Sequence, residues 1–227
     1  YITTPAGVAV VDVSDALQPK LLTTVALPGA RASMQQFRYL FVTDGEGLKV
    51  IDVTTPVRAR LVPGATVPLK DARKVFVSRT SAFVAAGPEG LAIIDVEAPE
   101  APKLHRMFDG GGQIRYARDV VVASTNASLF AYVADGTEGL KVVQLTAPDT
   151  QPNFYGFSPE PWPQVVATRR TKSAALSLSR PLERDRAVDE SGGQVAVFGR
   201  RGSRPFQQDE MRRLYLDDRG STWVVSD

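Results

Sequence analysis

The chain has 227 residues, with 27 lysines and arginines against 25 aspartates and glutamates, so its formal net charge is +2. It has no cysteine and one histidine, which excludes disulfides, iron–sulfur clusters, covalent haem attachment and multi-histidine metal sites within these residues. The hydrophobic content of 43% is that of an ordinary globular domain, and no run of about 18 apolar residues is present.

A short motif occurs four times along the chain, and each copy begins with a glycine followed by aliphatic residues. The leading glycines are 40, 43 and 49 residues apart. The four copies are Gly7–Val13, Gly47–Val53, Gly90–Val96 and Gly139–Leu145. A period of about 20–50 residues is typical of repeat proteins, in which each repeat forms one small unit of structure.

The motif and its flanking residues predict four short β-strands in each repeat. The motif core is rich in valine and isoleucine and too short for a helix, which favours a strand. A glycine-rich hairpin turn joins it to a preceding strand, as in Tyr39–Val42, Ala82–Val84 and Phe130–Val133. A further strand is expected before each hairpin, over Ala30–Ser33, Ala72–Val77 and Ala117–Val122. A fourth strand is expected to follow the motif, as in Lys103–Phe108.

The alternation of side chains indicates how these strands pack. In the second copy, Leu48 and Val50 share one face of the strand, while Ile51 and Val53 share the other. Both faces are apolar, as expected for a sheet packed between neighbouring sheets. Four strands in a repeat of this length make one blade of a β-propeller. The sequence therefore predicts an all-β propeller of four-stranded blades, with about four to five copies and the first one incomplete.

Several segments resemble a known family of repeats. Tyr132–Val143, followed by Thr146–Pro148, resembles the LVIVD repeat of bacterial and archaeal β-propeller proteins, and Phe41–Asp52 and Phe83–Asp95 are similar to it. The resemblance extends over residues 1–157. It implies an exported protein that is extracellular, periplasmic or on the cell surface, and it implies no defined activity.

The repeat also sets the expected domain boundaries. The propeller is expected to consist of a half-blade over 1–28 and blades over about 29–68, 69–110 and 111–157. A proline-rich stretch follows and marks a boundary. Residues 158–227 are expected to form a degenerate fifth blade, with a motif copy at Gly193–Phe198, and a C-terminal extension with a short helix over Gln207–Leu216.

Two groups of acidic residues recur in the repeats. Asp12, Asp52 and Asp95 end the third strand of their copies, and we interpret them as structural residues that cap the following turn. An active site that collects these carboxylates is the alternative, although one catalytic site rarely recurs in every blade. The hairpin loops hold a second group, Asp44, Glu46, Glu89, Asp135 and Glu138. We expect solvated turns there rather than calcium sites, because Ca²⁺ needs about six oxygen ligands and each loop offers too few.

Three arginines are the main candidates for a binding site. Arg31, Arg73 and Arg118 each follow an alanine at the start of the expected innermost strand, and these starts gather at one mouth of a propeller channel. Guanidinium groups there would bind a carboxylate, a phosphate, a haem propionate or a partner protein. The alternative is that they form ion pairs between blades, for instance with Asp71 and Asp119.

No catalytic constellation is visible, so the leading hypothesis is a non-enzymatic scaffold or protein-binding module. The Tyr1 start and the incomplete first copy favour a subunit or fragment of a larger exported or cell-surface assembly. Its partners would be other protein subunits, or the missing part of the parent chain, that complete the ring. We expect no cofactor, no membrane span and, given the balanced charge, no nucleic-acid partner.

The sequence is also compatible with two alternative functions. The first is an accessory subunit that holds a multihaem cytochrome in extracellular electron transfer, since this chain has no haem attachment site of its own. The second is a hydrolase or lyase with its site in the channel, formed by Asp119, Arg118 and Arg73.

Overall fold

A computed structural model describes most of the chain and divides it into two compact units, residues 1–179 and 180–227. The described residues are 1–15, 17–125, 128–147, 158–179, 200–201, 204–205 and 219. The motif copy expected at Gly193–Phe198 and the helix expected over Gln207–Leu216 lie outside them. In the second unit a short ribbon pairs β16 (Arg200–Arg201) with β17 (Arg204–Pro205).

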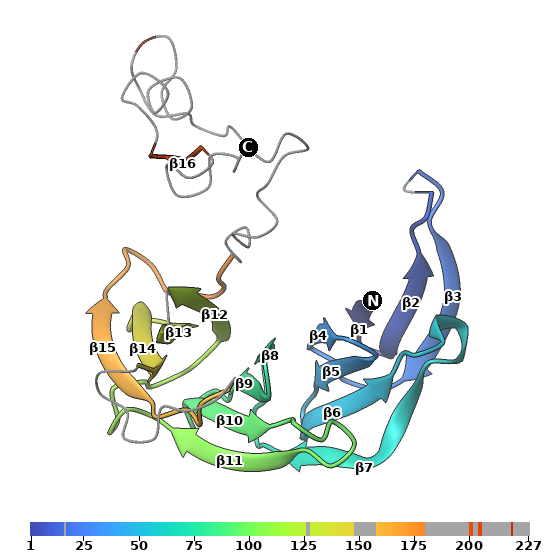
Figure 1. The fold of residues 1–227 in the computed structure, drawn as a ribbon, viewed down its shortest axis with the longest axis horizontal. Coiled ribbons are helices and arrows are strands. Elements are labelled where there is room, and N and C mark those ends of the chain that lie inside the picture. The colour runs from blue at the N-terminus through green and yellow to red at the C-terminus, as the bar shows by residue number, and fades with distance from the viewer. Residues whose placement is uncertain are drawn as a thin grey trace. The chain divides into compact units, whose positions relative to one another are not determined.

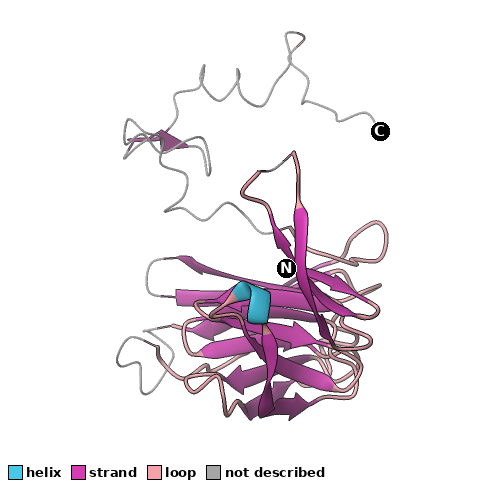
Figure 2. Ribbon diagram, turned by 90° about the vertical axis from the view of Figure 1, so that its right-hand side faces the viewer, coloured by secondary structure: helices cyan, strands magenta, loops and turns pink. Residues whose placement is uncertain are grey.

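The first unit consists of antiparallel β-sheets, with one 3-10 turn at Pro56–Arg58 (Figure 2). The end sheet has three strands, β1 (Ile2–Thr4), β2 (Gly7–Asp12) and β3 (Lys20–Ala26). The first blade has four, β4 (Ala32–Gln36), β5 (Tyr39–Thr43), β6 (Gly47–Asp52) and β7 (Arg60–Pro68). The second blade has β8 (Lys74–Ser78), β9 (Ser81–Ala85), β10 (Leu91–Asp95) and β11 (Lys103–Phe108). The third blade has β12 (Asp119–Thr125), β13 (Ser128–Ala134), β14 (Leu140–Thr146) and β15 (Gln164–Arg169).

The blades follow one another in chain order, and each is a simple meander of neighbouring strands (Figure 1). The first strand of each blade lies on the inner side of the row, and the fourth lies on the outer side. Strand β8 packs against β4 of the preceding blade and β12 of the following one. The prediction of an all-β propeller fold with four-stranded blades is therefore confirmed.

No helix in the described part of the chain is long and apolar enough to cross a membrane.

The core consists of three apolar clusters, one between each pair of consecutive sheets. Leu48 and Val50 lie in the cluster between the first and second blades. Ile51 and Val53 lie in the cluster between the first blade and the end sheet. The predicted two-sided burial of this strand is thus confirmed, and it explains why the motif is apolar at consecutive positions.

The leading glycine of each motif lies where the outer strand passes closest to it. A Cβ atom on Gly47 would lie 2.0 Å from the Val67 carbonyl oxygen, and one on Gly90 would lie 2.5 Å from that of Phe108. Both glycines also have positive φ angles, of 149° and 82°. Glycine is therefore required here by the approach of a second backbone as well as by the turn conformation.

The end sheet has more structure than the half-blade expected over 1–28. Ile2–Thr4 forms a second strand, with Ile2 opposite Ala9 in the ladder of β2. The sheet thus has three strands, and among the described residues it lacks only a counterpart of the innermost strand. Sequence reasoning overlooked β1 because it is only three residues long and has no aromatic or valine run.

The third blade ends later than the boundary expected after residue 157, since its outer strand is β15. In the other three sheets the connection from the motif strand to the outer strand has seven residues, at 13–19, 53–59 and 96–102. In the third blade it has 17 residues, 147–163. This longer connection places the outer strand beyond the proline-rich stretch, which is why sequence reasoning assigned that segment to another blade.

Candidate functional site

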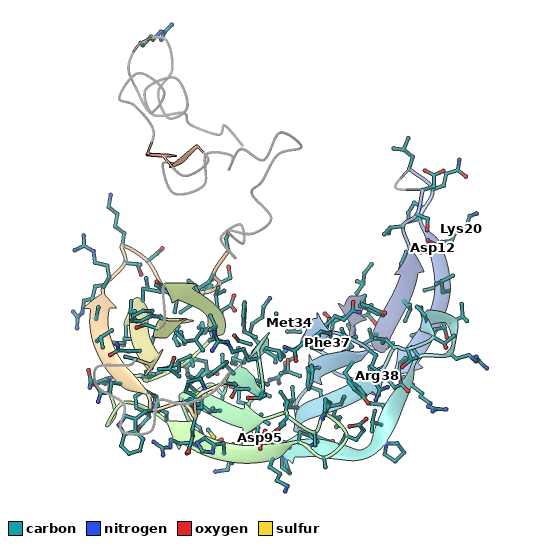
Figure 3. All side chains as sticks on the ribbon, in the orientation of Figure 1. Asp12, Lys20, Met34, Phe37, Arg38 and Asp95 are labelled. Atoms are coloured by element: carbon teal, nitrogen blue, oxygen red, sulfur yellow. The ribbon has the colours of Figure 1, made fainter. Side chains whose placement is uncertain are left out.

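The aspartates that end the third strands bind backbone N–H groups of the turns that follow. The Oδ1 atoms of Asp12, Asp52 and Asp95 each accept an N–H bond of 2.9 Å from the residue two positions later, Ser14, Thr54 and Glu97. Hydrogen bonds from Thr54 hold the pKa of Asp52 below its ordinary value. Asp12 lies beside Lys20 on the end sheet, whereas Asp95 lies on the second blade (Figure 3). These carboxylates therefore do not gather into one site.

The three candidate arginines occupy equivalent positions just before β4, β8 and β12. Two of them share one acid, Asp71. Arg31 Nη1 donates to Asp71 Oδ1 at 2.7 Å, and Arg73 Nε donates to Asp71 Oδ2 at 2.9 Å. Arg31 Nη1 also donates to the Ala72 carbonyl oxygen at 3.0 Å. Arg31 and Asp71 thus join the first blade to the segment that enters the second.

Tyr116 continues this chain of contacts toward the third blade. Arg73 Nη2 donates to the Tyr116 hydroxyl at 2.6 Å, and that hydroxyl donates to Asp71 Oδ2 at 3.0 Å. The guanidinium carbon atoms of Arg73 and Arg118 lie 4.8 and 5.0 Å from the centre of the Tyr116 ring, within the range of a cation–π interaction. We call Arg31, Asp71, Arg73, Tyr116 and Arg118 the arginine row.

The electrostatics of the row centre on Asp71. Partial burial alone would raise the pKa of this carboxyl group, but hydrogen bonds from Arg73, Tyr116 and Arg31 outweigh it and leave the pKa below its ordinary value. Burial likewise works to lower the pKa of Arg73, and its bond to Asp71 raises it overall. Asp71 is therefore ionised at neutral pH and neutralises part of the charge of two arginines.

Among the described residues, Arg118 ends the row without an acidic partner. Its Nε is buried and has no hydrogen-bond partner among the described residues. The expected ion pair with Asp119 is not formed, because the Asp119 carboxylate binds backbone instead: Oδ1 accepts the Val120 N–H at 2.7 Å and Oδ2 accepts the Leu178 N–H at 2.9 Å. The arrangement proposed for a channel hydrolase or lyase therefore lacks a free carboxylate at this position.

Two of the loop acids are not on solvated turns, and that expectation is wrong for them. Asp44 and Asp135 have side chains that are 2% and 0% exposed. Asp44 Oδ2 lies 2.6 Å from Lys49 Nζ, and Asp135 Oδ2 lies 3.6 Å from Lys141 Nζ. These ion pairs lie beneath the hairpin turns of the first and third blades.

Asp135 also positions part of the arginine row. Its Oδ1 accepts the backbone N–H of Arg115 at 2.9 Å and that of Tyr116 at 2.6 Å. The carboxylate thereby fixes the segment from which the Tyr116 ring reaches Arg73. Sequence reasoning missed this role, although a signal exists in the motif copies. The acid and the lysine occur together in two blades, whereas Ala86 and Ala92 occupy both positions in the second blade.

Within the described part of the chain, no three His, Cys, Asp or Glu side chains gather in a way that would hold a metal ion.

Fold and repeats together define a β-propeller-type repeat protein, an architecture that suits a scaffold or binding module. The model of the LVIVD repeat matches residues 70–109 and 114–156, which span the second blade and the first three strands of the third. These two segments are thus LVIVD repeats, and the resemblance seen in the motifs is confirmed there.

Some solved structures are similar to parts of the chain. The computationally designed Ika4 protein is 13% identical over 69% of this chain and 84% of its own, with a TM-score of 0.42. The computationally designed Ika8 protein is 12% identical over 54% of this chain, with a TM-score of 0.38, and the matched part is 36% of its own length. No curated protein matches the sequence.

Proposed function

We propose that this LVIVD-repeat chain is a non-enzymatic scaffold that binds further protein through its two outermost sheet faces, as part of a larger exported or cell-surface assembly. One observation supports the proposal most directly. The end sheet and the third blade expose apolar positions that the inner blades bury against a neighbour.

The end sheet shows this on the face that points away from the first blade. Val11 and Val13 hold the same repeat positions as Ile51 and Val53, which are buried against the end sheet. Val11 is only half-buried, and Val13 is 65% exposed. Leu21 pairs with Val11 in the ladder and is also 65% exposed. This face therefore has the composition of a blade interface, and no other described sheet packs against it.

The third blade also exposes apolar side chains, on the face that points away from the second blade. Tyr132, Leu140 and Val142 are partly exposed. Their counterparts in the second blade, Phe83, Leu91 and Ile93, are fully buried against the third blade. The two outermost faces are thus of opposite kinds, one like the surface that receives a following blade and one like the surface that packs on a preceding one.

Exposed apolar faces of this kind favour association with protein of matching shape. Among the described sheets, those in the middle of the row pack against a neighbour on both sides, whereas the two outermost sheets pack against one. A further blade, from another subunit or from the rest of a parent polypeptide, would bury each face in the way that the inner faces are buried. This supports a structural role within an assembly.

The test is the mass of the native species that contains this chain. Native mass spectrometry of material purified from the source organism should show a species heavier than one 227-residue chain. Replacing Val13 and Leu21 with glutamate should release the chain from that species, because the charges would have to be buried in the interface. Phe37→Asn is the matched control, since Phe37 is 89% exposed in the turn between β4 and β5. A lone chain in the native material would overturn the proposal.

A further inference from the structure

The arginine row follows a rule that is visible in the repeat. In the second and third blades, the residue that precedes the alanine at the start of the innermost strand contacts the arginine of the preceding blade. Asp71 does this for Arg31, and Tyr116 does it for Arg73. Each of these residues also contacts the arginine of its own copy, Arg73 and Arg118 respectively. Every arginine of the row except the last is thus bound by the next copy.

The segment after the third blade repeats the backbone pairing of this pattern but lacks the side chain that contacts the arginine. Ala175 pairs with Gly136 of the third blade just as Ala117 pairs with Gly87 of the second. Ala174 therefore holds the position of Asp71 and Tyr116, and it has no group that can bind a guanidinium. Arg118 is the arginine that Ala174 would have to contact.

We propose that Arg118 binds a carboxylate ligand at the position that Ala174 leaves without an acid. The guanidinium of Arg118 has no hydrogen bond or ion pair within the described residues, and its buried Nε is unsatisfied. Buried polar atoms in folded proteins are normally hydrogen-bonded, so an unsatisfied one indicates a missing partner. The inference is independent of the outermost sheet faces, because it concerns residues at the start of the innermost strands.

Charge and geometry both favour a carboxylate. The row contains three cationic side chains and one anionic side chain, so its formal charge is positive. Asp71 shows how the row accommodates an acid, with one oxygen on each of two guanidinium groups at 2.7 and 2.9 Å. Arginine presents a planar set of donors that matches the two oxygens of a carboxylate. The ligand is therefore a free carboxylic acid or an acidic side chain of another protein.

The described residues on the side of the missing acid are exposed. Ala174 and Leu176 are exposed, and Arg118 itself is only partly buried. Gly136 lies against the guanidinium, since a Cβ atom there would be 3.4 Å from Nε. We place the ligand over Ala174, where its carboxylate would meet the guanidinium of Arg118 and supply the partner that Nε lacks.

Arginine side-chain NMR tests the proposal on the whole chain. Acetate should produce a saturable shift of the Nε–Hε signal of Arg118, assigned by its loss in Arg118→Lys. The Arg31 signal is an internal control that should not move, because Arg31 is already bound to Asp71. Ala174→Asp supplies the acid within the chain, so in this variant the Arg118 signal should be shifted at the outset and acetate should have no further effect.

Two further additions identify the source of the ligand. If hexaglutamate shifts the Arg118 signal at a concentration at least tenfold below that of acetate, the result supports an acidic side chain of a partner protein as the ligand. Equal potency of the two compounds per carboxylate group supports a free acid. Inorganic phosphate that is more potent than both would overturn the choice of a carboxylate. If none of the three additions shifts the Arg118 signal in the wild type, the proposed site is wrong. This outcome includes the case in which an acid elsewhere in the chain already binds Arg118.

Discussion

The second blade differs from its two neighbours beneath the hairpin turn. The first and third blades bury an aspartate and a lysine there, whereas the second blade has two alanines, Ala86 and Ala92. The same backbone hydrogen bond closes the turn in all three blades. The Ala86 N–H donates to the Gly90 carbonyl oxygen at 2.8 Å, and the corresponding distances in the first and third blades are 3.0 and 2.7 Å. The backbone and the glycines therefore form the turn, and the ion pair is an addition to it.

The comparison also shows that acid and lysine are kept or replaced together. A buried charge that loses its partner is strongly unfavourable, while an apolar pair of suitable size is often as stable as the ion pair. Replacement of both residues by alanine is therefore compatible with the fold, and replacement of one alone is not. Asp135 has a second role, because it accepts N–H bonds from the segment that leads to Tyr116.

The largest effect is expected for Asp135→Ala. This change leaves Lys141 buried without its acid and removes the acceptor of two backbone N–H groups. We expect a loss of about 3–5 kcal/mol in the free energy of unfolding, measured by urea denaturation. Asp95→Ala is the control, since Asp95 is an exposed cap on the second blade and should cost about 1 kcal/mol. Equal losses in the two variants would contradict the interpretation of Asp135.

The next effect is the coupling between the two members of the pair. Adding Lys141→Ala to Asp135→Ala recreates the residues of the second blade, because it removes the charge that the first substitution left behind. We expect Lys141→Ala to cost about 1–3 kcal/mol less in the Asp135→Ala background than in the wild type. Strictly additive losses in this double-mutant cycle would show that the two side chains act separately.

A smaller effect is expected in the first blade. Lys49 is 17% exposed, against 6% for Lys141, and it also pairs with Glu46 at 2.8 Å. Lys49→Ala should therefore destabilise the chain by about 1 kcal/mol less than Lys141→Ala, because removal of the more exposed lysine leaves a space that water can enter beside the remaining acid. Thermal unfolding of the two variants side by side gives the comparison, and a larger loss in Lys49→Ala would reverse it.

The smallest effect is a pH dependence of the same lysine. Burial alone would lower the pKa of Lys49, but Asp44 and Glu46 raise it above the ordinary value of 10.5. A group with a raised pKa in the folded state stabilises the protein fully below its ordinary pKa, and this contribution is lost as the pH rises through the folded value. The difference in stability between the wild type and Lys49→Met should thus be constant near pH 8 and shrink above about pH 10.5. A difference that grows with pH would contradict the sign of the shift.

The fold could be predicted from the sequence because its determinants lie within single repeats. The glycine spacing and the alternation of Leu48 and Val50 with Ile51 and Val53 indicate blades packed on both sides, and the structure has them. The position of β15 could not be predicted, because a 17-residue connection hides it from a pattern based on shorter spacing. Strand β1 was too short to be recognised on its own.

The candidate site could be predicted only in part, because its contacts join different repeats. The equivalent positions of Arg31, Arg73 and Arg118 are visible in the sequence. The shared use of Asp71 and the contacts of Tyr116 depend on how consecutive blades pack, which no single repeat specifies. The buried state of Asp135 was also unexpected, since acidic residues in hairpin loops are usually solvated.

The long connection of the third blade indicates how tolerant this architecture is of added sequence. Each doubling of loop length costs only about 0.6 kcal/mol in closure entropy, so the step from seven to 17 residues is inexpensive. Strand β15 nevertheless pairs with β14 along most of its length, with Leu140 opposite Arg169 at one end and Gln144 opposite Gln164 at the other. The link between the third and fourth strands is therefore a natural insertion point, where an epitope tag or a grafted recognition peptide can be displayed on any blade.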